Sequence, residues 1–215
     1  MTIWKRAGSA LCGAVAVAAV VGLSAAPAMA VPASTSLKAK VTGGGSITAT
    51  AGTTELTAGP ITVTCTSSKA KGTISNGTKS GSAPLTVGTT KTLSFSKCSG
   101  PAGSVSNSPK KLPYDIKVDS KTTTKGDTDG VIGPVSVNVS TAGCSFTVTG
   151  YAPGYYSNSK HELIIGGKLP TKASTKAQLT IEDVATSCAG FVTAGEHPTF
   201  KTTYKVSKKV KIAVS

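Results

Sequence analysis

The chain has 215 residues and carries 23 lysine and arginine residues against 9 acidic ones, a formal net charge of +14. Aromatic residues make up only 5% of the sequence, while Thr, Ser, Val and Gly are abundant, as is typical of strands and turns. Arg6 is the only arginine. Because arginine is preferred for bidentate recognition of phosphates and bases, the composition argues against specific nucleic-acid recognition. The lysines favour a solvated surface with loose attraction to polyanions.

Residues 1–30 are predicted to be a secretory signal peptide. A basic pair, Lys5-Arg6, precedes a long uncharged stretch, and Ala28-Met29-Ala30 matches the small-x-small cleavage pattern. We expect residues 31–215 to form a single secreted β domain, extracellular or associated with the cell envelope. No later segment approaches the ~18 apolar residues of a membrane span, so no transmembrane segment is expected after cleavage.

Apolar and polar residues alternate in short runs, which predicts strands with one buried face and one wet face. In chain order, the expected strands cover residues 37–41, 46–51, 61–66, 92–95, 112–118, 135–139, 144–149, 162–165, 178–181, 200–206 and 209–214. Turn residues separate them at Gly43-Gly44-Gly45, Asn76-Gly77, Gly100-Pro101 and Asp129-Gly130. Many short strands at this spacing predict an all-β fold, either an antiparallel β-sandwich or a closed β-barrel.

Four cysteines follow the signal peptide: Cys65, Cys98, Cys144 and Cys188. An even number in an exported protein predicts two disulfides, with three connectivities to choose from. A weak internal repeat divides the chain into two halves, each with one cysteine on the apolar face of a strand and a second just past a later strand. This parallel favours Cys65–Cys98 and Cys144–Cys188 over the crossed pairings.

Several segments resemble a family of small secreted proteins of unknown function that is common in actinobacteria. The matching segments are Gly43-Gly44-Gly45-Ser46, Thr64-Cys65-Thr66-Ser67-Ser68, Leu93-Ser94-Phe95-Ser96-Lys97-Cys98-Ser99-Gly100-Pro101 and Gly154-Tyr155-Tyr156-Ser157-Asn158. The resemblance implies an exported β-protein and supplies no activity.

No catalytic arrangement emerges from the sequence, so we expect a non-enzymatic protein without a cofactor. A Gly-x-Ser-x-Gly nucleophile motif is absent. The two histidines adjoin glutamates, as His161-Glu162 and Glu196-His197, and these side chains could ligate zinc if their strands paired. Adjacent strand residues point to opposite faces, however, so only one member of each pair could reach a common ion. We therefore expect no metal site here.

Asp127-Thr128-Asp129-Gly130 resembles the start of a calcium-binding loop. The twelfth position of such a loop needs an acidic ligand, and the chain has Asn138 there. A hairpin turn at Asp129-Gly130 is the simpler interpretation.

Three tyrosines, Tyr151, Tyr155 and Tyr156, surround Pro153 and Gly154. Exposed on a loop, they could stack on sugar rings or contact another protein, giving a specific lectin-like or inhibitor-like module. The alternative is that one or two of them pack under a hairpin.

The C-terminal segment is rich in lysine. Lys201, Lys205, Lys208, Lys209 and Lys211 are candidate contacts for anionic cell-wall polymers or a lipid surface. Lysines that protect a sheet edge against aggregation are the competing explanation. Polyanion binding through a lysine-rich face is nevertheless our leading functional hypothesis, with the tyrosine-based module as the alternative.

Overall fold

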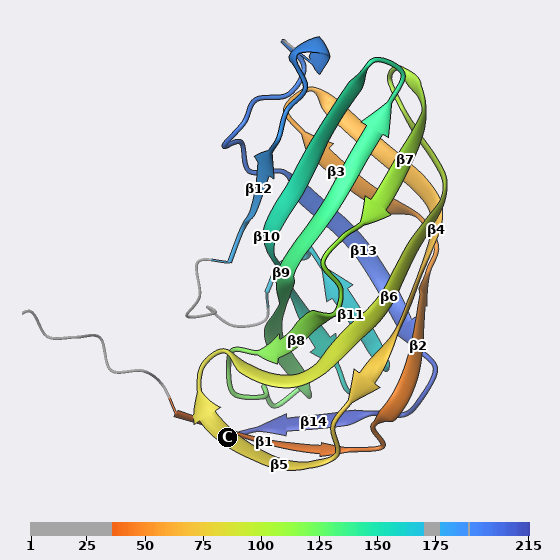
Figure 1. Cartoon of the computed structure of the whole chain (residues 1–215). Helices are drawn as coiled ribbons and strands as arrows, with labels where there is room; N and C mark the ends of the chain where they lie inside the picture. Colours follow the sequence, from red (N-terminus) through yellow and green to blue (C-terminus); the bar gives the residue numbers. More distant parts are fainter. Residues whose placement is uncertain (1–35, 170–176, 189) are drawn as a thin grey trace, which may run out of the picture. The chain divides into compact units, whose positions relative to one another are not determined.

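The computed structural model describes residues 36–169, 177–188 and 190–215 (Figure 1). The elements are β1 (Ser36–Thr42), β2 (Gly45–Ala51), β3 (Thr54–Ala58), β4 (Ile61–Ile74), β5 (Gly77–Ser82), β6 (Leu85–Gly100), β7 (Gly103–Pro109), β8 (Tyr114–Val118), β9 (Asp127–Thr141), β10 (Cys144–Ser157), β11 (Glu162–Ile165), β12 (Leu179–Glu182), the 3₁₀ turn η1 (Thr186–Cys188), β13 (Thr199–Val206) and β14 (Lys211–Val214). The all-β prediction is confirmed. The predicted signal peptide, residues 1–30, lies outside the described residues.

Eleven strands form one antiparallel sheet whose hydrogen-bonded pairings return to their starting strand. The ring runs from β9 through β10, β11, β13, β2, β4, β6 and β7 back to β9. β8 bridges β6 and β9, β3 bridges β13 and β4, and β12 adds to β10. The apolar faces of the ring strands therefore share one interior.

A second, three-stranded sheet has the order β14-β1-β5. Its inward residues, among them Leu37, Val41 and Ile212, form a hydrophobic cluster with Tyr156 and Val118 of the larger sheet. β1 shows why this segment becomes a strand, because apolar residues at every second position are buried and the residues between them are exposed. Figure 1 shows β1 between β5 and β14, so the first and last described strands lie side by side.

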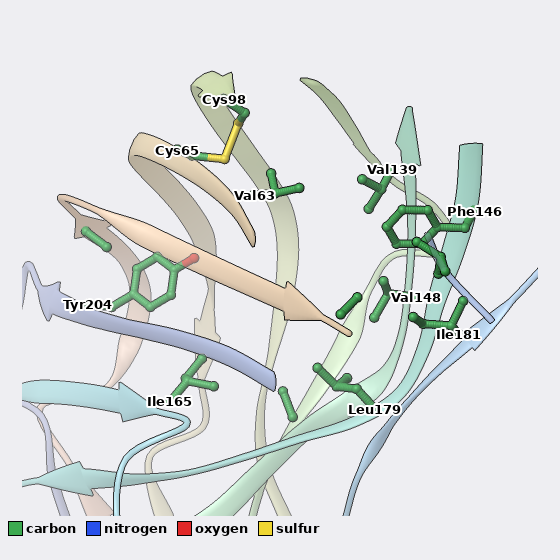
Figure 2. Packing of buried hydrophobic residues seen from close by; sticks show 14 of the residues in the cluster. Val63, Cys65, Cys98, Val139, Phe146, Val148, Ile165, Leu179, Ile181 and Tyr204 are labelled. Atoms are coloured by element: carbon green, nitrogen blue, oxygen red, sulfur yellow. A yellow bond between two sulfur atoms is a disulfide. The ribbon is translucent and has the colours of Figure 1, made fainter. Parts of the chain in front are cut away.

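The other hydrophobic cluster fills part of the ring interior (Figure 2). Val63 of β4, Phe146 and Val148 of β10, and Ile181 of β12 are all less than 5% exposed. Tyr204 of β13 projects into this cluster, and the side-chain hydroxyl of Ser68 donates a 2.7 Å hydrogen bond to its oxygen. Burial raises the pKa of Tyr204 above its ordinary value, and the hydrogen bond with Ser68 opposes that shift.

Both predicted disulfides are confirmed, Cys65–Cys98 and Cys144–Cys188. The predicted position just past a later strand holds for Cys188 but not for Cys98. Cys98 lies inside β6, directly opposite Cys65 of β4, with 3.9 Å between the two Cα atoms. Cys188 instead lies in η1, beyond β12, and ties this turn to the start of β10. The first bridge thus links two paired strands, whereas the second attaches a turn to the sheet.

The predicted hairpin turn at Asp129-Gly130 is wrong, because both residues lie in the paired part of β9. Asp129 is fully buried and Gly130 pairs with Val118 of β8. A Cβ atom at Gly130 would overlap the carbonyl oxygen of Lys117. The glycine is thus required by close approach of two strands and not by a turn conformation.

Candidate functional site

The five predicted lysine contacts do not lie on one sheet. Lys201 and Lys205 belong to β13 in the eleven-stranded sheet, whereas Lys211 belongs to β14 in the three-stranded sheet. The register places Glu55 opposite Lys201 and Glu162 opposite Lys205. Opposite charges at such cross-strand positions attract, so the field of these two lysines is partly compensated. The five lysines therefore do not share one cationic sheet surface.

The structure instead brings Lys211 together with two lysines that were not among the predicted contacts, Lys38 and Lys40 of β1. All three are exposed and lie on the outward side of the three-stranded sheet, which we call the lysine face. Lys211 pairs with Thr42 and is thus a diagonal neighbour of Lys40. Diagonal cross-strand neighbours and alternate residues of one strand are both about 7 Å apart.

The lysine face is uniformly cationic. None of β1, β5 and β14 contains an acidic residue. Lys38 lies opposite Ser80 and Ser215, and Lys40 lies opposite Thr78 and Ala213. Lys40 lies about 7 Å from each of the other two lysines, which is below the ~8 Å Debye length at physiological ionic strength, so neighbouring charges on this face act on a ligand together.

The turn between β13 and β14 extends this cationic surface. Lys208 and Lys209 are both exposed there. The carbonyl oxygen of Lys209 lies against Gly43, and the ammonium of Lys208 lies near Gly45. Gly43 lies in the turn that follows β1 and Gly45 begins β2, so the two lysines flank the end of the lysine face.

Edge protection does not explain Lys211, because side chains from two other segments already pair the outer edge of β14. Asn158 donates from its amide nitrogen to the carbonyl of Ile212 at 2.7 Å and accepts from the Ile212 amide at 2.8 Å. Thr122 pairs with Val214 in a similar way. Its backbone amide donates to the Val214 carbonyl, and its side-chain hydroxyl accepts from the Val214 amide. These contacts replace a neighbouring strand and hold the basic C-terminal strand in the sheet.

Tyr151, Tyr155 and Tyr156 lie within β10 and not on a loop. Tyr156 is buried, and its hydroxyl donates a 2.9 Å hydrogen bond to the carbonyl of Val210. Burial raises the pKa of Tyr156 to about 12. Tyr151 is exposed, with the ammonium of Lys117 5.6 Å from its ring centre, and Tyr155 is half-buried. The predicted tyrosine loop is therefore wrong as a structure, and Tyr156 is a packing residue.

The two histidines do not converge on a common site. His161 lies in the tight turn between β10 and β11 and adopts a positive φ. Nδ1 of His197 lies 3.0 Å from the carbonyl oxygen of Leu179. Nε2 of His197 lies 3.3 Å from the side-chain amide nitrogen of Gln178. Within residues 36–169, 177–188 and 190–215, no three His, Cys, Asp or Glu side chains are grouped so as to hold a metal ion.

Among the described elements, no helix has the length and apolar character needed to cross a membrane. Comparisons of the chain with protein-family models, with curated proteins and with solved structures give no match. The resemblance to small actinobacterial secreted proteins thus stays a prediction, and the structure establishes an all-β domain with two disulfides.

Proposed function

We propose that this protein is a non-enzymatic, exported domain that binds an anionic polymer of the cell envelope through the lysine face. The observation that carries the proposal is the placement of Lys38, Lys40 and Lys211 on one acid-free sheet surface, with neighbouring lysines about 7 Å apart. The two disulfides support export, because such bonds persist in oxidising compartments and are rare in the cytosol.

A polymer suits this surface better than a lipid bilayer. The outward residues of the three strands are Lys, Ser, Thr and Ala, so the lysine face offers no large apolar side chain to insert between acyl chains. The large exposed hydrophobic residues of the described chain, Tyr151 and Phe191, belong to other segments. The repeated phosphate or carboxylate groups of an anionic polymer could each contact one of the lysine ammonium groups in turn.

The test is co-sedimentation of the protein with isolated cell walls across a salt series. If each of the three lysines displaces one counterion, affinity falls roughly 20-fold between 50 and 200 mM salt, using the slope of about −0.7 per contact for a flexible polyanion. The triple variant Lys38→Gln/Lys40→Gln/Lys211→Gln is expected to lose this salt dependence, with the slope shallower by about 2.

A matched control removes the same net charge elsewhere. Lys69→Gln/Lys201→Gln/Lys205→Gln alters three exposed lysines of the eleven-stranded sheet and should retain the wild-type slope. Equal losses in both triple variants would show that net charge, and not the lysine face, governs binding. Binding to anionic phospholipid vesicles without binding to cell walls would contradict the choice of a polymer.

A further inference from the structure

A partly open cavity of about 150 Å³ lies within the ring of strands. Its wall is almost wholly apolar and is built from both hydrophobic clusters. Val139, Val148 and Leu179 contribute from the first cluster, and Val210 and Ile212 from the second. Figure 2 shows part of this wall, with Val63, Ile165 and Tyr204 projecting from separate strands toward the shared interior.

The cavity is poorly suited to water. A buried water molecule needs two to four polar partners, and dry apolar cavities of about this volume accept small apolar molecules instead. Three tyrosines line the wall, but the hydroxyls of Tyr156 and Tyr204 are bound to Val210 and Ser68, and that of Tyr114 to backbone carbonyls. The interior therefore offers its occupant mainly dispersion contacts.

One polar side chain in the wall has no partner. Thr54 of β3 is 1% exposed and lines the cavity, and its hydroxyl oxygen makes no hydrogen bond to any described residue. A buried hydroxyl without a partner is unfavourable, since it has lost its hydrogen bonds to water. A ligand with one hydroxyl or carbonyl oxygen would supply the missing bond.

The distribution of the lining residues favours an elongated ligand over a compact one. Along β4 alone the wall extends from Val63 to Ile74, which corresponds to about 35 Å of strand at a rise of about 3.3 Å per residue. The lining residues are thus distributed along the strand and not gathered around one point. An alkyl chain fits this form better than a fused ring system.

We propose that the interior cavity binds the alkyl chain of a small amphiphile, with Thr54 as the hydrogen-bond partner of its polar group. This site is independent of the lysine face, since none of the residues that line it is Lys38, Lys40 or Lys211.

The test titrates protein exported from the full-length sequence with 1-decanol and, separately, with benzene, and follows methyl resonances by NMR. We expect saturable shifts with decanol at Val139, Val148 and Ile165, which line the cavity. Leu37 and Ile181, which are buried but do not line it, should not move. The absence of saturable shifts, shifts that include Leu37 and Ile181 equally, or binding of benzene but not decanol would each overturn the proposal.

Two variants test the location. Ala152→Leu places a larger side chain at a buried position in the wall and should weaken decanol binding at least tenfold, whereas Ala213→Leu, at an exposed position of β14, should leave it unchanged. Thr54→Val keeps the side-chain shape and removes the unpartnered hydroxyl, so it should fold normally and weaken decanol binding about fivefold without affecting benzene. If folded Ala152→Leu binds decanol as tightly as the wild type, the assigned site is contradicted. If Thr54→Val does so, the assigned hydrogen-bond partner is contradicted.

Discussion

Replacing Tyr156 by phenylalanine should lower stability at neutral pH and raise it, relative to the wild type, in strong alkali. Tyr156 is 7% exposed, and its hydroxyl donates to the carbonyl of Val210, which joins β10 to the turn before β14. The phenylalanine ring fills nearly the same space but leaves this carbonyl without its donor. At pH 7 the loss should be about 1–2 kcal/mol in the free energy of unfolding.

The alkaline effect has the opposite sign. The pKa of Tyr156 is raised by burial to about 12, while an unfolded chain has a tyrosine pKa of about 10. The folded state therefore holds its proton to higher pH, and the stability associated with this group is present below pH 10 and is lost as pH rises toward 12. Linkage gives a loss of about 1 kcal/mol at pH 11 and about 3 kcal/mol well above pH 12. Tyr156→Phe has no such loss, so the two stability curves should cross near pH 11.

The assay is urea unfolding of both proteins between pH 7 and 12, compared as differences so that groups common to both proteins cancel. Tyr114 and Tyr204, whose pKa values burial also raises, are among these common groups. Tyr155→Phe is the matched control, because it removes a hydroxyl from the neighbouring, half-buried ring on the other face of β10. A constant difference between wild type and Tyr156→Phe across this range would refute the assignment of a buried, proton-retaining hydroxyl.

Two further predictions concern stability. Cys144→Ser/Cys188→Ser opens a bridge with a sequence separation of 44 and should lower the free energy of unfolding by about 4 kcal/mol in urea titrations, whereas a loss under 1 kcal/mol would mean that packing alone holds η1 against β10. Asn158→Ala removes both side-chain bonds to Ile212 and should cost about 1–3 kcal/mol, with faster hydrogen exchange at the Ile212 amide. In the conservative variant Asn158→Asp the side chain can still accept a hydrogen bond from the Ile212 amide. If that amide exchanged as fast in Asn158→Asp as in Asn158→Ala, the pairing of residue 158 with Ile212 would be contradicted.

Local patterns located part of most strands with clear apolar alternation, but β4, β6, β9 and β10 extend well beyond their predicted ranges and strands with little alternation were missed. β11 has the expected bounds, 162–165, and β13 differs from its predicted range by one residue at its start. β5 and β7 were not predicted, because their sequences, GTKSGS and GSVSNSP, are dominated by Gly and Ser and show almost no apolar alternation. β3 is only five residues long and was missed as well. Their partners β1, β6 and β4 position them.

The candidate sites depend on long-range pairing, which local sequence does not express. The alternation around Lys38 and Lys40 was visible within a predicted strand, but nothing nearby indicated that Lys211 would lie beside them. The lysines of β13 were grouped with Lys211 because they are close in sequence, and the structure separates them into different sheets. The cavity is still less predictable, since its volume is set by how many strands complete the ring.

The pairing of β1 with β14 has a consequence for the order in which the domain can form. Ala39 pairs with Val214, so the first described strand lacks one of its two neighbours until the last one has been made. A chain that emerges from its N-terminus, whether from a ribosome or through a membrane channel, cannot complete this sheet early. Such non-local pairing slows folding and leaves the Lys-bearing strand β1 half-paired during emergence. The lysine face is consequently among the last surfaces of the molecule to be assembled.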